Sequence, residues 1–489
     1  MSMLAQARIS AQASQLGHAL NGNVSLYAPR GSTAVTPTFT DQTVSIAPAN
    51  GNTSPAFGSK VVFNLPKNST LISQCWIRST LSPGQTNPAY TPPLNGAAEV
   101  GTPQAEYVKN VGDFLFANHS VQYGNSQLQN FDGAFVALFR RLIRNDVNIE
   151  GTNAMILGNL PPSTSVTGPE QVLVDAFYNG VTVYTPLEEL FFAKNLDEAW
   201  MTEAYALEGQ IISQLADLSS VVVTKTRSNS VLTGGGAVLP ALSNVNLVYI
   251  EITLSAAEKD NRLKHYRTPE GLVNTWMDLE YQKGVVLTSS YARPGGAPGP
   301  VLALSPLVTR VVQLNNLRMD MAELVFCIRR LTNSNAATVY PDENGTLQPW
   351  SGSPLEGSNG LNGSRLSPIN GVANTGFATL IDIQSFALKA GQKLLYAETI
   401  DSFWNRAQMR KSYHKDAQIV GAVYCIPFAR FPEDCKNATG FLSASTLGVL
   451  TLEITYRDPG NNISYQFDLW DRCYNLMQSR GGGIVAALK

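Results

Sequence analysis

A two-residue alternation of apolar and polar side chains constrains this chain more than any other feature. It is clearest in NLVYIEITL (246–254), where one side of the segment carries Val248, Ile250, Ile252 and Leu254. In TLISQCWIRSTL (70–81) the same spacing places four residues on one face: Leu71, Ser73, Cys75 and Ile77. Successive side chains of a β-strand point to opposite sides of its sheet, so this period predicts strands.

Further strands are expected in many short segments along the chain. They are SKVVFNLP (59–66), FLFANHSVQYG (114–124), GVTVYTP (180–186), GQIISQLADLSSVVVT (209–224), RVVQLNNL (310–317), AELVFCIRR (322–330), QIVGAVYCIPFA (418–429) and GVLTLEITYR (448–457). Long Pro- and Gly-rich loops separate them, as in NPAYTPPLNGAAEVGTP (87–103) and ARPGGAPGP (292–300). Strands and helices do not alternate regularly, which favours an all-β sandwich over a parallel α/β sheet.

Only a few helices are predicted. In DGAFVALFRRLIRN (132–145) one helical face carries Phe135, Leu138, Phe139 and Leu142. Ser255 and Glu258 have the spacing of a capping box, which predicts a short helix after the strand at 246–254. A glycine-rich stretch near residue 235 divides the chain into halves of similar strand content, so we expect two sandwiches in tandem.

Composition argues against several functional classes. Of the 489 residues, 44% are hydrophobic and only 15% are charged, and the net charge is −2. This balance gives no overall basic surplus, so we expect no DNA binding along an extended charged face, while local basic patches stay open. The start of the chain has no apolar region typical of a secretory leader, and TGFLSASTLGVLTL (439–452) is too short and polar to span a membrane. We therefore expect neither secretion by the usual route nor a membrane-embedded protein.

The cysteines and histidines offer no metal-binding pattern. Five cysteines occur without a CxxC motif, and the four histidines (His18, His119, His265 and His414) do not pair at ligand spacing. Cys425 and Cys435 leave three alternatives open: a metal site, a local disulfide, or two free thiols. Free thiols are favoured, because the small cysteine content is typical of a reducing compartment. We predict no metal ligands and no cofactor.

Catalytic patterns are also missing from the sequence. No GxSxG elbow occurs, and the glycine runs LTGGGAV and SRGGGIV lack the Lys-Ser/Thr of a phosphate loop. Four acidic pairs are candidates for glycosidase carboxylates: Glu188/Glu189, Asp197/Glu198, Asp278/Glu280 and Glu433/Asp434. Neighbours on a turn do not provide that geometry, so they are interpreted as solvated turn charges. We predict no catalytic residues.

Two further polar features have modest functional meaning. The basic run RAQMRKSYHK, which contains Tyr413, could contact a phosphate backbone, but a solvated helix face or a contact with an acidic neighbour is favoured. Eight glycosylation sequons begin at Asn23, Asn52, Asn68, Asn118, Asn344, Asn362, Asn437 and Asn462. They predict little without a secretory leader.

Six segments, read in order over residues 105 to 455, resemble one protein family. VGDFLFANHSVQYGNSQLQNFDGAFVALFRRL carries glycines at family positions (Gly124 and Gly133), and VYTPLEELFF resembles a Pro-Leu-x-Phe-Trp-Phe segment. LVYIEITLSAAEKDNRLKHY, NTWMDLEYQ, AELVFCI and FWNRAQMRKSYHK follow. The strongest match is VYCIPFARFPEDCKNATGFLSAS, through Phe428, Ala429, Pro432, Glu433, Gly440 and Ser443.

These segments are similar to the major capsid proteins of nucleocytoplasmic large DNA viruses, such as iridoviruses and chlorella viruses. SKVVFNLPKNS replaces the family's glycine-rich amino-terminal region, and the Trp of Pro-Leu-x-Phe-Trp-Phe is absent, so a divergent member is expected. The resemblance implies two tandem eight-stranded jelly rolls. The expected division is an arm at 1–55, a first jelly roll at 56–230, a linker at 231–245, and a second jelly roll with a carboxy-terminal tail at 246–489.

The resemblance also implies a structural function without catalysis. Three copies would form a pseudo-hexagonal capsomer of an icosahedral double-stranded DNA virus, assembled in the host cytoplasm. The implied partners are further trimers, minor capsid and penton proteins, and an internal membrane. Two rival hypotheses remain: a glycan- or receptor-binding viral surface protein, and a β-sandwich glycoside hydrolase using residues such as Glu188 or Glu433.

Overall fold

The computed structural model describes a large part of the chain as antiparallel β-structure. The described residues are 39–67, 70–87, 89–91, 105–107, 111–133, 135–136, 155–156, 175–190, 199–218, 221–224, 235–267, 272–288, 306–330, 383–399, 423–432, 439–458, 464–480 and 483–485. All strand pairings within these ranges are antiparallel. None of the helices in them is long and apolar enough to cross a lipid bilayer.

Two sheets form the first sandwich. One has the order β1-β11-β3-β7 and contains β1 (Phe39–Ile46), β11 (Leu242–Leu254), β3 (Thr70–Leu81) and β7 (Val181–Pro186). The other has the order β2-β9-β5-β6 and contains β2 (Lys60–Asn64), β9 (Gly209–Leu215), β5 (Phe116–Tyr123) and β6 (Ser126–Asp132). The short β8 (Trp200–Met201) joins β3, and β4 (Ala105–Tyr107) pairs with β10 (Val222–Thr224).

The second sandwich repeats this architecture. Its inner sheet has the order β12-β20-β14-β17 and contains β12 (Leu272–Thr288), β20 (Ser464–Arg480), β14 (Asp320–Arg330) and β17 (Val423–Pro427). Its outer sheet has the order β13-β19-β15-β16 and contains β13 (Leu307–Gln313), β19 (Leu450–Arg457), β15 (Ile383–Ala390) and β16 (Lys393–Thr399). The short β18 (Leu442–Ser443) and β21 (Gly483–Val485) join β14 and β20.

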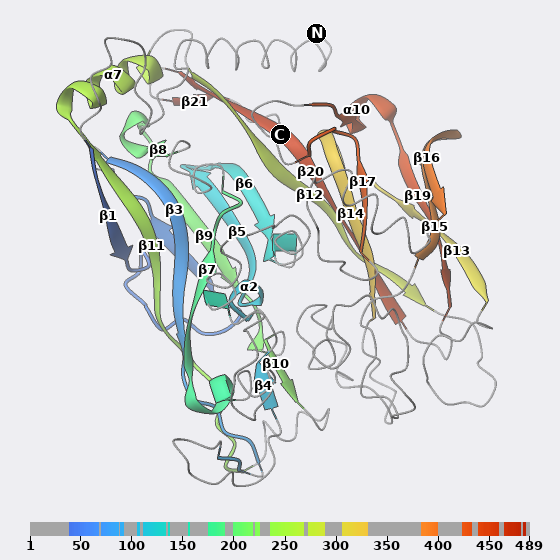
Figure 1. Ribbon diagram of the computed structural model, residues 1–489, viewed down its shortest axis with the longest axis horizontal. Helices are drawn as coiled ribbons and strands as arrows, with labels where there is room; N and C mark the ends of the chain where they lie inside the picture. The colour runs from blue at the N-terminus through green and yellow to red at the C-terminus, as the bar shows by residue number, and fades with distance from the viewer. Residues whose placement is uncertain are drawn as a thin grey trace, which may run out of the picture.

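Short helices sit at the ends and between the halves. They include α2 (Val111–Phe114), the 3₁₀ turn η2 (Thr202–Ala204), α7 (Ala256–Arg267) and α10 (Ala444–Leu447). The helix predicted from Ser255 is α7, which connects the two sandwiches. In Figure 1 the first sandwich lies on the left, the second on the right, and β12 and β20 face the first sandwich. The predicted all-β fold, with two tandem sandwiches of eight principal strands, is confirmed.

The predicted alternation largely determines which side chains enter the cores. β9 and β19 alternate strictly between buried and half-buried positions. On β3, all four residues of the predicted face are buried: Leu71, Ser73, Cys75 and Ile77. Most of the buried apolar residues of both halves belong to one continuous cluster, so the two sandwiches share a core.

The predicted domain limits need correction. β11 was expected to open the second jelly roll, but it pairs with β1 and β3 in the first. Gly235 and Gly236 form a turn before β11 and not a junction between domains. Residues 39–46 of the predicted arm form β1, and the predicted carboxy-terminal tail contains β20, which lies between β12 and β14. Long-range pairing decides these limits, and local composition does not report it.

Candidate functional site: the seam between the two sandwiches

The two sandwiches meet along a buried contact between β6 and the strands β12 and β20. We call this contact the seam and define it by Gln129, Asn130, Asp132 and Phe135 of the first sandwich with Met277, Asp278, Lys283 and Trp470 of the second. β6 is the edge strand of its sheet, so its outer side is open to the neighbouring sandwich.

Asp132 is the central polar group of the seam. Its Oδ2 accepts a hydrogen bond of 2.7 Å from the indole Nε1 of Trp470, and its Oδ1 accepts one of 2.8 Å from Lys283 Nζ. The Asp132 side chain is only 8% exposed, whereas that of Lys283 is 27% exposed. Both carboxylate oxygens therefore bind donors from the second sandwich, which satisfies the buried charge.

Two neighbouring residues extend these polar contacts. Gln129 Nε2 donates to the carbonyl of Met277 at 2.8 Å and to that of Glu189 at 3.0 Å. The backbone amide of Asn130 donates to Asp278 Oδ1 at 3.2 Å. These bonds fix the position of β6 along β12, because backbone groups take part on both sides.

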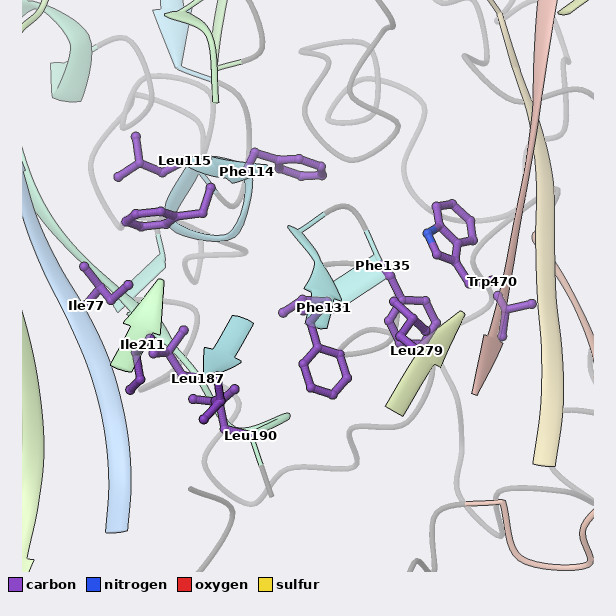
Figure 2. Packing of buried hydrophobic residues seen from close by; sticks show 14 of the residues in the cluster. Ile77, Phe114, Leu115, Phe131, Phe135, Leu187, Leu190, Ile211, Leu279 and Trp470 are labelled. Atoms are coloured by element: carbon purple, nitrogen blue, oxygen red, sulfur yellow. The ribbon is translucent and has the colours of Figure 1, made fainter. Parts of the chain in front are cut away.

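An apolar contact completes the seam. The rings of Phe135 and Trp470 lie with centroids 6.0 Å apart. Figure 2 shows Phe131 and Phe135 between the core of the first sandwich and Leu279 and Trp470 of the second. Burial of these large apolar side chains stabilises the contact between the two sandwiches through the hydrophobic effect.

A second buried polar group lies within the inner sheet of the second sandwich. Arg472 Nη1 forms an ion pair with Glu323 Oε1 at 2.7 Å, and both side chains are nearly inaccessible. Glu280 Oε2 accepts hydrogen bonds from the amides of Arg318 and Met319 at 2.8 and 2.9 Å. Burial, with the charges of Glu280, Glu323 and Asp320, raises the pKa of the Asp471 carboxyl well above its ordinary value.

The structure corrects one reading of the acidic pairs and leaves two outside the described residues. Asp278 and Glu280 lie on β12, Asp278 fully buried and Glu280 half-buried, so their interpretation as solvated turn charges is wrong. The polar residues of this segment are typical of a turn, but the segment forms the long strand β12, and Asp278 is buried within it. Glu188 and Glu189 do lie in a turn after β7. Asp197/Glu198, Glu433/Asp434 and the basic run around Tyr413 fall outside the described residues.

The predicted free thiols are partly described. Cys425 lies on β17 as a buried free thiol, and burial is the main cause that raises its pKa. Cys435 lies outside the described residues. His119 is a core residue whose Nδ1 lies 2.9 Å from Ser213 Oγ. Of the sequons, Asn52 is exposed and Asn118 is half-buried on β5, while the other six asparagines lie outside the described residues.

Sequence reasoning missed strand β20 and its buried side chains, including Trp470, Asp471 and Cys473. A signal was present, because Tyr465, Phe467 and Leu469 alternate with polar residues. The charged residues that follow concealed the strand, since Asp468, Asp471 and Arg472 are typical of an exposed tail.

Solved structures of other proteins share this architecture. No protein-family model matches the chain, and no curated protein matches its sequence. Among solved structures, a chain of the quasi-atomic model of the PBCV-1 virus capsid has a TM-score of 0.61 at 14% identity, covering 94% of this chain and 99% of that chain.

Two further structures agree with this result. The Faustovirus major capsid protein has a TM-score of 0.60 at 12% identity, covering 94% of this chain and 93% of its own. A chain of the Sputnik virophage has a TM-score of 0.52 at 10% identity, covering 94% of this chain and 91% of its own. The predicted resemblance to major capsid proteins is thus confirmed at the level of the fold, with strongly diverged sequence.

Proposed function

We propose that this chain is the major capsid protein of an icosahedral double-stranded DNA virus, with a structural and non-catalytic role. The observation that supports this most is the pair of eight-stranded sandwiches held by a buried seam, in the fold of viral capsid proteins. Three such chains present six similar sandwiches, which suits a pseudo-hexagonal capsomer that tiles a hexagonal lattice.

The seam provides the fixed orientation of the two sandwiches that a capsid subunit needs. A tiling subunit must hold its two sandwiches at one fixed angle, because an error in that angle displaces every neighbour in the shell. Asp132, Gln129 and Phe135 fix the angle through contacts with the inner sheet of the second sandwich. The proposed partners are other copies of this chain, minor capsid and penton proteins, and a membrane beneath the shell, in virions assembled in the host cytoplasm.

The first test is the mass of the purified protein in solution. We expect about three times the chain mass of 52.8 kDa by light scattering, and hexagonal particles or arrays by electron microscopy. A stable monomer that forms no particles at micromolar concentration contradicts the proposal.

A matched pair of variants links assembly to the seam. Asp132→Ala removes the acceptor for Trp470 and Lys283, so we expect fewer or misshapen arrays. Asp260→Ala changes an exposed acid on α7 and is expected to assemble like the wild type. Normal arrays from the folded Asp132→Ala protein contradict a role of the seam in assembly.

A further inference from the structure

Three side chains of metal-binding type converge on the inner sheet of the second sandwich. Glu280 of β12 lies opposite Asp471 of β20 in the strand register, and Cys473 lies two positions further along β20. Residues two apart on a strand share one face, so Asp471 and Cys473 both lie on the side of Glu280. One potential ligand atom from each of the three lies within 4.8 Å of the other two.

Asp471 is the member of this cluster that points to a ligand. It is fully buried, and within the described part of the chain neither of its carboxylate oxygens has a hydrogen-bond partner. The nearest cationic side chain on its own strand, Arg472, already pairs with Glu323 at 2.7 Å. A buried carboxylate surrounded by other acids is strongly unfavourable unless a cation or a proton neutralises it.

We propose that Glu280, Asp471 and Cys473 bind a zinc ion. Zinc takes thiolate and carboxylate ligands together, whereas calcium and magnesium take oxygen ligands only. The backbone amides of Arg318 and Met319 donate hydrogen bonds to Glu280 Oε2 and so orient its carboxylate, as donors behind a metal ligand do. Cys473 Sγ donates to the carbonyl of Asp278 at 3.4 Å; on binding, its thiol proton is released to solvent.

The position of this site suggests its purpose. A zinc ion here cross-links β12 to β20, and these strands also carry Asp278 and Trp470 of the seam. The ion would neutralise the buried acidic cluster and stiffen the sheet against which the first sandwich packs. This inference concerns the stability of one chain and does not depend on assembly into a shell.

The test uses the full chain, purified without chelator and then treated with EDTA. Elemental analysis should find about one zinc per chain before treatment, and added zinc chloride should raise the melting temperature of the EDTA-treated protein. Calcium chloride should not. Cobalt chloride should give a thiolate-to-cobalt charge-transfer band, a readout on the wild type that requires no variant.

Variants assign the ligands. Asp471→Asn and Cys473→Ser should each lower zinc affinity by more than the roughly 10- to 100-fold caused by changing a group that only hydrogen-bonds to a metal ligand. Asp468→Asn is the matched control, because Asp468 is a buried acid on the same strand whose Oδ1 accepts from Gln466 Nε2 at 2.6 Å. It should retain zinc.

Three outcomes would overturn the inference. The first is a zinc-free protein whose melting temperature does not change when zinc is added, together with a higher melting temperature for Asp471→Asn. That result would identify Asp471 as a buried protonated acid. The second is full zinc binding by Asp471→Asn and Cys473→Ser. The third is cobalt binding without a thiolate band.

Discussion

Two glycines show how single residues set the chain path at close approaches. A Cβ at Gly133 would lie 1.8 Å from the carbonyl oxygen of Phe116, and one at Gly440 would lie 2.8 Å from that of Phe428. Gly440 also has a φ of +153°, a conformation that L side chains rarely adopt. Both obstacles are backbone atoms, which cannot move aside as a flexible side chain would.

The steric requirement at Gly133 can be tested directly. Gly133→Ala should lower the free energy of unfolding by about 3 kcal/mol or more, because the clash forces β5 and the end of β6 apart. Urea denaturation followed by tryptophan fluorescence measures the change. Gly235→Ala is the control: nothing lies within 4 Å of its Cβ position, so we expect a change within about 0.5 kcal/mol. Equal stability of the two variants would contradict the steric argument.

Tyr249 predicts a loss of stability at alkaline pH. Burial first, then the charges of Glu251 and Cys75, raises its pKa from an ordinary value of 10.0 to about 12. In the unfolded chain the Tyr249 phenol loses its proton near pH 10.0, whereas in the folded protein it keeps the proton up to a pH of about 12. The contribution of Tyr249 to stability is therefore fully present below pH 10.0 and is lost as the pH rises to about 12. Tyr249→Phe should lose less stability over this range in urea titrations, and parallel curves for both proteins would exclude the effect.

At the scale of elements, the sequence predicts strands well where one face meets solvent. Strands β3, β9 and β19 follow the alternation. Strand β11 departs from it at a register shift after Tyr249: Tyr249 is buried, whereas Val248 and Ile250 of the predicted face are half-buried. The alternation fails for β20, a central strand whose Asp468, Asp471 and Arg472 are buried among the neighbouring strands. Sequence reasoning places such charges in solvent, because their buried partners come from distant parts of the chain. The seam was unpredictable for the same reason, since Asp132 and Trp470 are 338 positions apart.

The central place of β20 makes the second sandwich sensitive to truncation. A chain ending at residue 463 loses the strand between β12 and β14, so we expect insoluble protein. Of the described strands, a chain ending at residue 482 loses only β21, which pairs with Gln478–Arg480 of β20. We expect that chain to remain soluble and folded. Soluble yield and circular dichroism measure both. Folded protein from the shorter chain would mean that β20 is dispensable.

At the scale of the whole molecule, one apolar cluster and the seam make the two sandwiches a single unit. The domain limits predicted from glycine content were displaced because β11 returns to the first sandwich. The connection between the halves is α7, whose Lys259 pairs with Glu203 of η2 at 2.9 Å. Unfolding should therefore be one cooperative transition for the wild type.

Breaking the seam should uncouple the halves. Asp132→Ala leaves the buried indole N–H of Trp470 without its acceptor, which we expect to cost about 2 kcal/mol or more and to separate unfolding into two transitions. Differential scanning calorimetry shows the number of transitions. Asp132→Asn keeps an oxygen acceptor and should lie between Asp132→Ala and the wild type. A single unshifted transition for Asp132→Ala would mean that the apolar contact alone joins the halves.

The order of strands within the inner sheet also has a consequence for biosynthesis. Asn475 of β20 donates a hydrogen bond to Asp278 of β12 across 197 positions, and in the described sheet β14 is joined to β12 through β20. A ribosome therefore delivers β12 and β14 long before the strand that joins them. During that interval β12 lacks its neighbour β20, and β14 can pair with β17 and β18 but keeps one open edge. Open strand edges promote aggregation. Efficient production of this protein should accordingly depend on chaperones that shield nascent strands until translation reaches β20.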